Sequence, residues 1–342
     1  MKKICFFLLL FLPAVFSYAD SADSLNIQNS QSSQAPQSSQ ASLASVKSPK
    51  VTRENNTFTI DFGATENEDE KLITAIGNSP TITCQKGGQT FLRVDGLLGS
   101  PELNGYITDL ITHYHTDHIS RSVVEQCLKE GSFNRIIAPY PQLKVSKVKV
   151  FSELSGKEKT SPDGDTEKEA PVIDITPGGK APERNFSAVI GDFYYSSLEV
   201  NSDITVEMVK YGKPRNANND GLVYRITHKG VSCLLFGDFD DPEGINELLD
   251  IFSEYGQKCD VIKWPHHAHR FADNQKTDGI IARMNDVLDP CYIIWERHET
   301  QSADKFREYI QRFSFSGKFL CSDDMEIRII SFFRIENLTP FG

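Results

Sequence analysis

The sequence predicts an α+β fold in which two β-sheets lie between outer helices within one domain. Three observations support this prediction. Short stretches that alternate apolar and polar residues come in groups, as in sheets with one buried face. Stretches with helical spacing separate these groups. The chain of 342 residues is 39% hydrophobic and 24% charged, which is typical of a globular protein with a large core.

The N-terminus has the three parts of a secretory signal peptide. Lys2 and Lys3 give it a positive start, residues 4–16 form an apolar core, and Ser17 and Ala19 are small residues that suit signal peptidase. This core is too short to span a membrane as a stable helix. We therefore expect cleavage near Ala19 and a secreted or periplasmic protein without an integral membrane segment. An uncleaved anchor is the alternative.

A linker is predicted between this signal peptide, residues 1–19, and the folded part of the chain. Residues 20–50 are rich in Ser and Gln, and the pentapeptide QSSQA occurs twice among them. Few of these side chains could pack in a core, so they cannot offset the entropy lost on ordering. We predict a disordered linker over residues 20–50 and a single folded domain over residues 51–342.

The first part of this domain is predicted to contain four strands and one helix. Two β-type stretches flank the paired Gly87-Gly88, as in a hairpin. Further on, Val123, Cys127 and Leu128 would share one face of a helix. The predicted strands cover residues 57–62, 81–84, 90–94 and 106–112, and the predicted helix covers residues 119–130.

A polar stretch interrupts the pattern at about residues 144–180. It carries three prolines and the pair Gly178-Gly179, so we predict an insertion or long loop. Strand signals resume after it, and two of the strands form a hairpin around Lys229-Gly230. The predicted strands cover residues 204–209, 222–227, 231–236, 261–262, 292–295 and 326–332, and the predicted helices cover residues 242–255 and 302–313.

Charge and cysteine content narrow the classes of function. The net charge of −11 comes from 47 acidic and 36 basic residues, and it becomes −13 when Lys2 and Lys3 leave with the signal peptide. Such a field disfavours non-specific capture of polyanions, so a nucleic acid would need a local basic patch.

The six cysteines beyond residue 19 lack C-x-x-C spacing, which does not support zinc-finger chemistry. Buried free thiols and one or more disulfides both stay open.

The chemistry of the chain is concentrated in residues 113–118, His-Tyr-His-Thr-Asp-His, between a predicted strand and a predicted helix. On the extended part of this turn, His113 and His115 point the same way and could chelate one ion. Asp117 and His118 could face a second ion a few Å away. Imidazole and carboxylate ligands suit Zn²⁺, and mixed sites of this kind also admit Mn²⁺ or Fe.

The remaining ligands must come from distant parts of the sequence. Asp238 follows an apolar strand and Gly237, so its carboxylate could bridge two ions. Alternatively, Asp238 could stabilise a turn or cap the N-terminus of a helix, and Asp240 or Asp241 could do this equally well. A second strand ends at His266-His267, and we expect His267 to be a ligand.

These motifs resemble those of the metallo-β-lactamase fold superfamily over most of residues 57–332. The resemblance implies a four-layer αββα sandwich and a single catalytic domain that hydrolyses its substrate with bound metal. Within the superfamily, the chain is most similar to the exported nuclease-like domain of ComEC-type DNA-uptake competence proteins. The residues that carry the resemblance are Val94-Asp95-Gly96, residues 113–118, Asn218-Asn219, Gly237-Asp238 and Pro265-His266-His267.

Two departures from the family pattern affect the predicted site. No histidine corresponds to the family's third motif, because only His228, at a hairpin tip, lies between residues 118 and 238. Binding of the first ion, by His113, His115 and Asp238, is therefore expected to be the weaker. Ala268 and His269 also replace the family's small residues, which changes the expected contacts to substrate. The substrate-side residues we expect are Lys263, His266, His269 and Asn219.

The predicted activity is that of a metal-dependent phosphodiesterase or nuclease. Two Zn²⁺ ions, or Mn²⁺ in their place, would hold a bridging hydroxide, and Asp117 would orient it and take its proton. A lysine-rich patch would attract a phosphodiester or nucleic acid locally, and its members are Lys144, Lys147, Lys149, Lys157 and Lys159. The alternatives are a small-molecule hydrolase, such as a lactonase or β-lactamase, and a non-catalytic metal-binding domain. No feature of the sequence identifies a protein partner.

Overall fold

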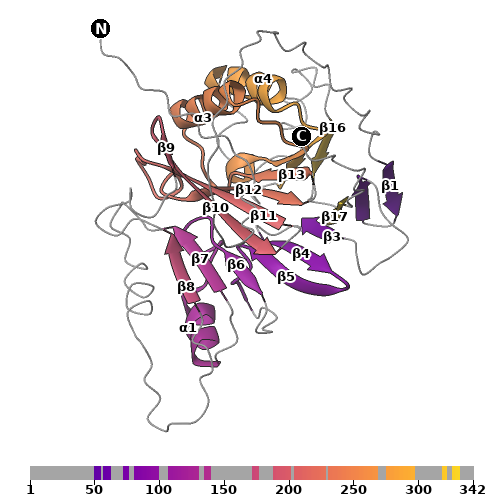
Figure 1. Ribbon diagram of the computed structural model, residues 1–342, viewed down its shortest axis with the longest axis vertical. Helices are drawn as coiled ribbons and strands as arrows, with labels where there is room; N and C mark the ends of the chain where they lie inside the picture. Colours follow the sequence, from indigo (N-terminus) through magenta and orange to yellow (C-terminus); the bar gives the residue numbers. More distant parts are fainter. Residues whose placement is uncertain are drawn as a thin grey trace, which may run out of the picture. The chain divides into compact units, whose positions relative to one another are not determined.

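Two β-sheets form most of the computed structural model of the protein (Figure 1). All residues that the structure describes belong to one compact unit, Lys47–Gly342. The described residues are 50–54, 57–62, 72–76, 81–99, 107–130, 135–139, 172–176, 188–201, 204–228, 230–268, 275–296, 318–321 and 326–331.

The first sheet has nine strands in the order β1-β2-β17-β3-β4-β5-β6-β7-β8. Its strands β5 to β8 run parallel to one another, whereas β3, β4 and β5 form an antiparallel meander. The bounds are β1 (Lys50–Glu54), β2 (Thr57–Asp61), β3 (Leu72–Ile76), β4 (Ile82–Lys86), β5 (Gln89–Val94), β6 (Thr108–Leu110), β7 (Arg135–Pro139), β8 (Val172–Thr176) and β17 (Glu326–Ser331).

The second sheet has eight strands in the order β16-β15-β14-β13-β12-β11-β10-β9. Its strands β13 to β16 are parallel, and β9 to β13 are antiparallel. The bounds are β9 (Ala188–Ile190), β10 (Phe193–Asn201), β11 (Ile204–Tyr211), β12 (Leu222–His228), β13 (Val231–Leu235), β14 (Val261–Lys263), β15 (Tyr292–Trp295) and β16 (Lys318–Cys321).

The alternation of side chains along β12 shows how the core is divided. Leu222, Tyr224 and Ile226 are buried in one cluster together with residues of the nine-stranded sheet. Val223 points the opposite way and packs in a second cluster with residues of the helices. Because successive side chains of a strand lie on opposite faces, the second sheet is buried on both sides. One core therefore lies between the sheets and the other between the second sheet and its helices.

Three α-helices are described, namely α1 (Arg121–Glu130), α3 (Pro242–Glu254) and α4 (Gln275–Leu288), with a short 3₁₀ turn η3 (Pro265–Ala268). Figure 1 shows α3 and α4 together, and Leu248 of α3 and Met284 of α4 pack in the same core cluster. Helix α3 begins sharply because the Asp241 carboxylate accepts hydrogen bonds from two backbone N–H groups of its first turn. Within the described residues, no helix is long and apolar enough to cross a membrane.

All ten predicted strands are found, but some elements were not predicted. Strand β8 lies within residues 144–180, for which an insertion or long loop was predicted, and it pairs in parallel with β7. Strands β9 and β10 and helix α4 occupy stretches for which no element was predicted. The predicted helix at residues 302–313, the signal peptide and most of the linker lie outside the described residues.

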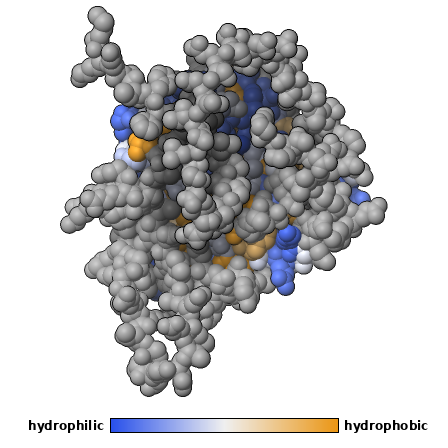
Figure 2. Space-filling model, in the orientation of Figure 1, coloured by the Kyte–Doolittle hydropathy of each residue, from blue (hydrophilic) through white to orange (hydrophobic). Residues whose placement is uncertain are grey.

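The hairpin and thiol predictions can also be compared with the structure. The turn between β4 and β5 is exposed, and Figure 2 shows hydrophilic residues at this position. Among the described residues, Cys84, Cys233 and Cys259 are buried thiols that form no disulfide. Of the two alternatives left open for the cysteines, the free thiol holds for these three.

Candidate metal centre

The predicted metal ligands come from loops that follow parallel strands. Residues 113–118 follow β6, Asp238 follows β13, and His267 follows β14. Strands β5 and β6 are parallel in one sheet, and β13 and β14 are parallel in the other. The carboxyl ends of parallel strands meet at one edge of a sheet, where sites in α/β proteins commonly lie. Segments far apart in the sequence are brought together in this way.

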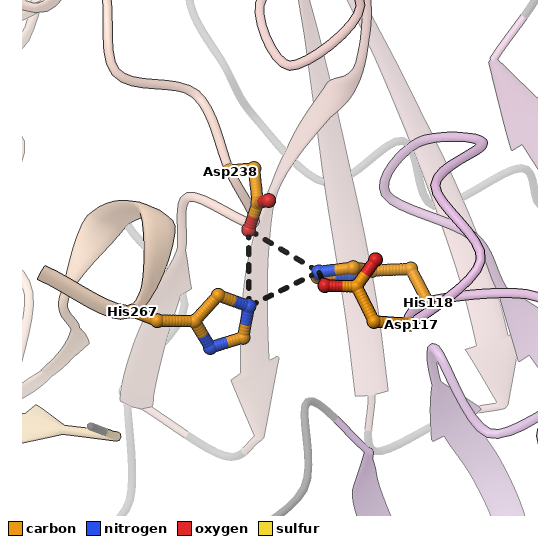
Figure 3. Close-up of side chains that lie close together, drawn as sticks. All are labelled: Asp117, His118, Asp238 and His267. Carbon is orange, nitrogen blue, oxygen red and sulfur yellow. Dashed lines mark hydrogen bonds and ion pairs between the residues drawn. The ribbon is translucent and has the colours of Figure 1, made fainter. Parts of the chain in front are cut away.

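The carboxylate of Asp238 lies at the centre of the site, and its two oxygens face different imidazoles. Oδ1 is 3.2 Å from His118 Nε2 and 3.4 Å from His267 Nε2. Oδ2 is 3.4 Å from His113 Nε2 and 4.0 Å from His115 Nδ1. Figure 3 shows His118 and His267 converging on Asp238, with Asp117 beside His118. One carboxylate therefore separates two groups of possible ligands.

The six predicted ligands fall into these two groups. Asp117, His118, Asp238 and His267 form the first, and His113, His115 and Asp238 form the second. Within each group the ligand atoms lie within 4.8 Å of one another, which is close enough to surround one ion. Asp238 belongs to both groups.

Two buried atoms at this point fit a bound cation. His113 Nε2 and Asp238 Oδ1 are shielded from water, and neither has a hydrogen-bond partner of suitable geometry among the described residues. A buried polar atom left in this state costs about 1–3 kcal/mol. A divalent cation accepts lone pairs from both imidazole nitrogen and carboxylate oxygen. The residues present therefore fit a metal of the zinc type.

The ionisation of His113, His115 and Asp238 suits metal ligands, whereas His118 would release a proton on binding metal. Burial lowers the pKa of His113 and of His115, so both imidazoles favour the neutral form that binds metal. Burial alone would raise the pKa of Asp238, but His113 and His118 lower it below its usual range. Burial likewise lowers the pKa of His118, yet the carboxylates of Asp95 and Asp238 outweigh it and raise this pKa to about 10.

Asp95 orients His118, and the sequence analysis did not include it among the site residues. It follows β5, and its Oδ2 is 2.8 Å from His118 Nδ1. The same carboxylate accepts hydrogen bonds from Thr112 N and Thr112 Oγ1, at 2.8 Å and 2.6 Å. Asp95 itself has a φ of 51°, which is uncommon for a residue other than glycine. The motif Val94-Asp95-Gly96 was the available signal for this role.

Glu296 is a second residue that the sequence analysis missed. It follows β15, and its Oε2 lies 3.4 Å from His267 Nδ1 and 2.8 Å from Lys263 Nζ. All three side chains are buried. Lys263 was expected to contact substrate, but in the structure it is paired with Glu296 away from solvent. An acidic residue directly after an apolar strand, as at Asp238, was the signal for Glu296.

The other expected substrate contacts are distributed differently. Asn219 is buried, and its Oδ1 accepts hydrogen bonds from the backbone N–H groups of Asp240 and Asp241, at 2.9 Å and 3.1 Å. In the structure it therefore holds the loop after β13. His266 lies beside Asp238, with Nε2 at 3.7 Å from Oδ2. His269 and the lysine-rich patch lie outside the described residues.

Comparison with known proteins gives structural neighbours of one kind. No protein-family model and no curated protein matches the chain. The metallo-β-lactamase fold protein YhfI of Bacillus subtilis is 14% identical, with a TM-score of 0.46 over 75% of this chain and 98% of YhfI.

Two further solved structures resemble the chain. A protein of Parabacteroides distasonis described as a metal-dependent hydrolase is 15% identical, with a TM-score of 0.41 over 74% of this chain and 94% of its own. A Thermotoga maritima protein described as a Zn-dependent hydrolase of the metallo-β-lactamase superfamily is 10% identical, with a TM-score of 0.36 over 73% of this chain and 98% of its own. The structural neighbours are thus metallo-β-lactamase fold proteins.

Proposed function

We propose that this protein is a metal-dependent hydrolase whose centre is built on Asp238. The observation that carries the proposal is the division of ligands around this carboxylate, with His118 and His267 at one oxygen and His113 and His115 at the other. Two ions would each find imidazole and carboxylate ligands. We expect these ions to be zinc, with manganese as the alternative. Asp238 would hold both.

The chain's own residues would perform the remaining tasks. A divalent cation held here would supply a Lewis acid that activates water at neutral pH. Asp117 is 56% exposed while its neighbour His118 is 1% exposed, so Asp117 alone of this pair reaches the solvent side. It would orient the attacking water and accept its proton. Asp95 and Glu296 would hold His118 and His267 in place by their outer nitrogens.

The substrate we propose is a phosphodiester. The support is the resemblance of the sequence to the nuclease-like domain of ComEC-type proteins, together with the lysines in residues 144–159. The same resemblance supports a fourth, helical layer on the nine-stranded sheet. We also propose export, because residues 1–19 have the pattern of a cleavable signal peptide. A lactone or β-lactam substrate is the alternative within the same chemistry.

The test is to purify residues 20–342, measure bound metal and assay four substrates. These are bis-p-nitrophenyl phosphate, a single-stranded DNA oligonucleotide, a lactone and a cephalosporin. We expect one to two equivalents of zinc or manganese and hydrolysis of the two phosphodiesters. A protein that contains no transition metal and takes none up on titration would contradict the metal-dependent hydrolase. Cephalosporin turnover above that of either phosphodiester would reject the substrate assignment.

A second experiment tests how a polymer would be held. Lys144, Lys147 and Lys149 are replaced together by glutamate, and cleavage of DNA is compared with cleavage of the small phosphodiester. An acidic protein repels DNA unless a local patch attracts it, and such attraction weakens as salt rises. We expect DNA cleavage to fall steeply and cleavage of the small substrate to change little. Equal effects on both would show that these lysines do not bind the polymer.

A further inference from the structure

The two groups of ligands around Asp238 are unequal. One has four residues, whereas the group of His113 and His115 has only these two imidazoles and the shared carboxylate. His228, the histidine between residues 118 and 238, cannot join them. The backbone N–H of Leu222, at the start of β12, donates to the carbonyl of Thr112, the residue before His113. His228 lies at the other end of β12, roughly 20 Å away at about 3.3 Å per residue.

We propose that His266 is the third imidazole ligand of the ion at His113 and His115, and that Asp240 positions it. This inference rests on the proposed metal-dependent function and specifies the ligands of one ion. His266 Nε2 lies 3.7 Å from Asp238 Oδ2, the oxygen that His113 Nε2 approaches to 3.4 Å. Three imidazoles therefore surround this one oxygen, and together with the shared carboxylate they would give this ion four protein ligands.

Asp240 fixes the ring of His266 in the orientation that a ligand requires. Its Oδ2 is 2.6 Å from His266 Nδ1, and both carboxylate and ring are largely buried. When Nδ1–H donates to this carboxylate, the lone pair of the ring is on Nε2, which is the nitrogen beside Asp238. Metal-binding histidines are commonly held in this way by a carboxylate at the other ring nitrogen.

The backbone supports the same assignment. His266 and His267 have φ values of 47° and 45°, so two consecutive residues other than glycine adopt the left-handed conformation. Such strain costs on the order of 1–3 kcal/mol per residue and concentrates at functional sites. The His266 N–H also donates to the carbonyl of Gly237 at 2.8 Å, which holds the turn beside Asp238. As a result, successive histidines face the two different oxygens of one carboxylate.

An alternative role for His266 is to contact the substrate, as the sequence analysis expected. Asn218 Nδ2 lies 3.3 Å and 3.2 Å from the two ring nitrogens, so polar partners surround the ring whether or not it binds metal. The two roles differ in one measurable respect. A ligand contributes to metal affinity in the absence of substrate, whereas a substrate contact does not.

The experiment measures zinc stoichiometry and affinity, by competition with a chelator, in wild type and three variants. We expect wild type to bind two ions that differ in affinity. His266→Gln should leave one ion in place and weaken the other by at least tenfold, and Asp240→Asn should weaken the same ion by roughly 10–100-fold. The matched control is Asp241→Asn, because Asp241 caps α3 and its change should leave both affinities as they are.

The outcomes separate this inference from the proposed function. Two ions bound by His266→Gln with wild-type affinities would overturn the inference and leave the metal-dependent hydrolase standing, even if activity fell. A wild type that binds no zinc would overturn both. Circular dichroism establishes that each variant is folded. If His266→Gln fails to fold, Asp240→Asn decides the question, since wild-type affinities in that variant would overturn the role of Asp240 and of the ring it positions.

Discussion

Asp117 is the most exposed of the candidate ligands, because its side chain is 56% accessible, compared with 43% for His115 and 3% for Asp238. Its removal should therefore affect chemistry more than packing. We predict that Asp117→Ala lowers kcat for bis-p-nitrophenyl phosphate by about 10²-fold or more, as expected for loss of a general base, with the fold unchanged. Unchanged kcat would assign proton transfer to another residue.

Glu296 should act on metal binding through His267. Burial would raise the pKa of Glu296, but Lys263 lowers it to about 2, so the carboxylate is charged at neutral pH and can hold His267 Nδ1. We predict that Glu296→Gln weakens binding of the ion at His118 and His267 by roughly 10–100-fold, measured by zinc titration. The exposed Glu243→Gln, on a surface pair with Arg215, is the control.

A second variant separates this effect from instability. Glu296→Gln leaves Lys263 buried without its partner, which destabilises proteins by about 3–5 kcal/mol. The double variant Lys263→Met/Glu296→Gln removes the unpaired charge. Its stability should recover while its zinc affinity stays low. Recovery of both would mean that Glu296 acts only through packing.

Residues adjacent in sequence were easier to predict than residues brought together by the fold. His113, His115, Asp117 and His118 stand within six positions, so their chemistry is visible in one motif. The pair of Glu296 with Lys263 spans two parallel strands, and no local pattern predicts their register. For the same reason, the sequence suggested a substrate contact for Lys263, which in the structure is buried beside Glu296.

At the scale of elements, the turn between β13 and Asp238 depends on one glycine. Gly237 has a φ of 55°, and a Cβ at this position would lie 2.7 Å from Thr112 Cβ. We predict that Gly237→Ala lowers the free energy of unfolding by roughly 1–2 kcal/mol for the left-handed backbone and by about 1–3 kcal/mol more for the overpacked contact. Zinc affinity should fall as well, because Thr112 and Asp95 hold His118.

Gly88→Ala is the matched control for this variant. Gly88 has a φ of 74° in the β4–β5 turn, and a Cβ there would meet nothing within 4 Å. Only the cost of the left-handed backbone applies to Gly88→Ala. Urea unfolding should therefore show a smaller loss of stability than in Gly237→Ala, and zinc titration should show no change in affinity. Equal losses in the two variants would mean that the contact with Thr112 is easily relieved.

Elements with clear periodicity and clear ends were predicted best. Helix α3 has Asp241 and Pro242 at its start, and its predicted bounds differ from the observed Pro242–Glu254 by one residue. Helix α4 carried a usable signal that was not recognised, because Ile281, Met284 and Leu288 recur at helical spacing. Strand β8 lies in a polar, proline-rich interval, and it is the pairing with β7 that defines it. The local propensity of β8, VIDIT, favours a strand, but the polar residues around it obscured this signal.

At the scale of the whole molecule, buried thiols link stability to pH. Burial raises the pKa of Cys84 and of Cys259 from 9.0 to about 11. The folded state therefore retains the proton that the unfolded chain releases, so this stabilisation is complete below pH 9.0 and is lost as pH rises towards 11. We predict that each thiol contributes a fall of roughly 1.4 kcal/mol per pH unit in this window.

The measurement is urea unfolding between pH 8 and pH 10.5 on wild type, Cys84→Ala and Cys259→Ala. Lysine and tyrosine side chains titrate in the same range, so the difference between wild type and variant isolates each thiol. The slope against pH should be shallower in both variants. Parallel curves would show that these thiols do not ionise on unfolding.

Metal binding should stabilise the molecule as a whole because its ligands come from both sheets. His113 and His118 follow β6 of the nine-stranded sheet, whereas Asp238 and His267 follow β13 and β14 of the eight-stranded sheet. An ion bound only by the folded state contributes about 2.7 kcal/mol at a free concentration of 100 times its Kd. For a domain of this size we predict that Tm rises by roughly 5–10 °C on saturation with zinc and that a chelator reverses the rise. Asp238→Asn removes the shared ligand charge and should abolish most of this shift. Its own Tm without metal should be lower than that of wild type, because His113 and His118 lower the pKa of Asp238 and its charge therefore stabilises the folded state. Differential scanning calorimetry with zinc and with chelator measures both values, and an equal zinc-dependent rise in Asp238→Asn would place the bound metal elsewhere in the molecule.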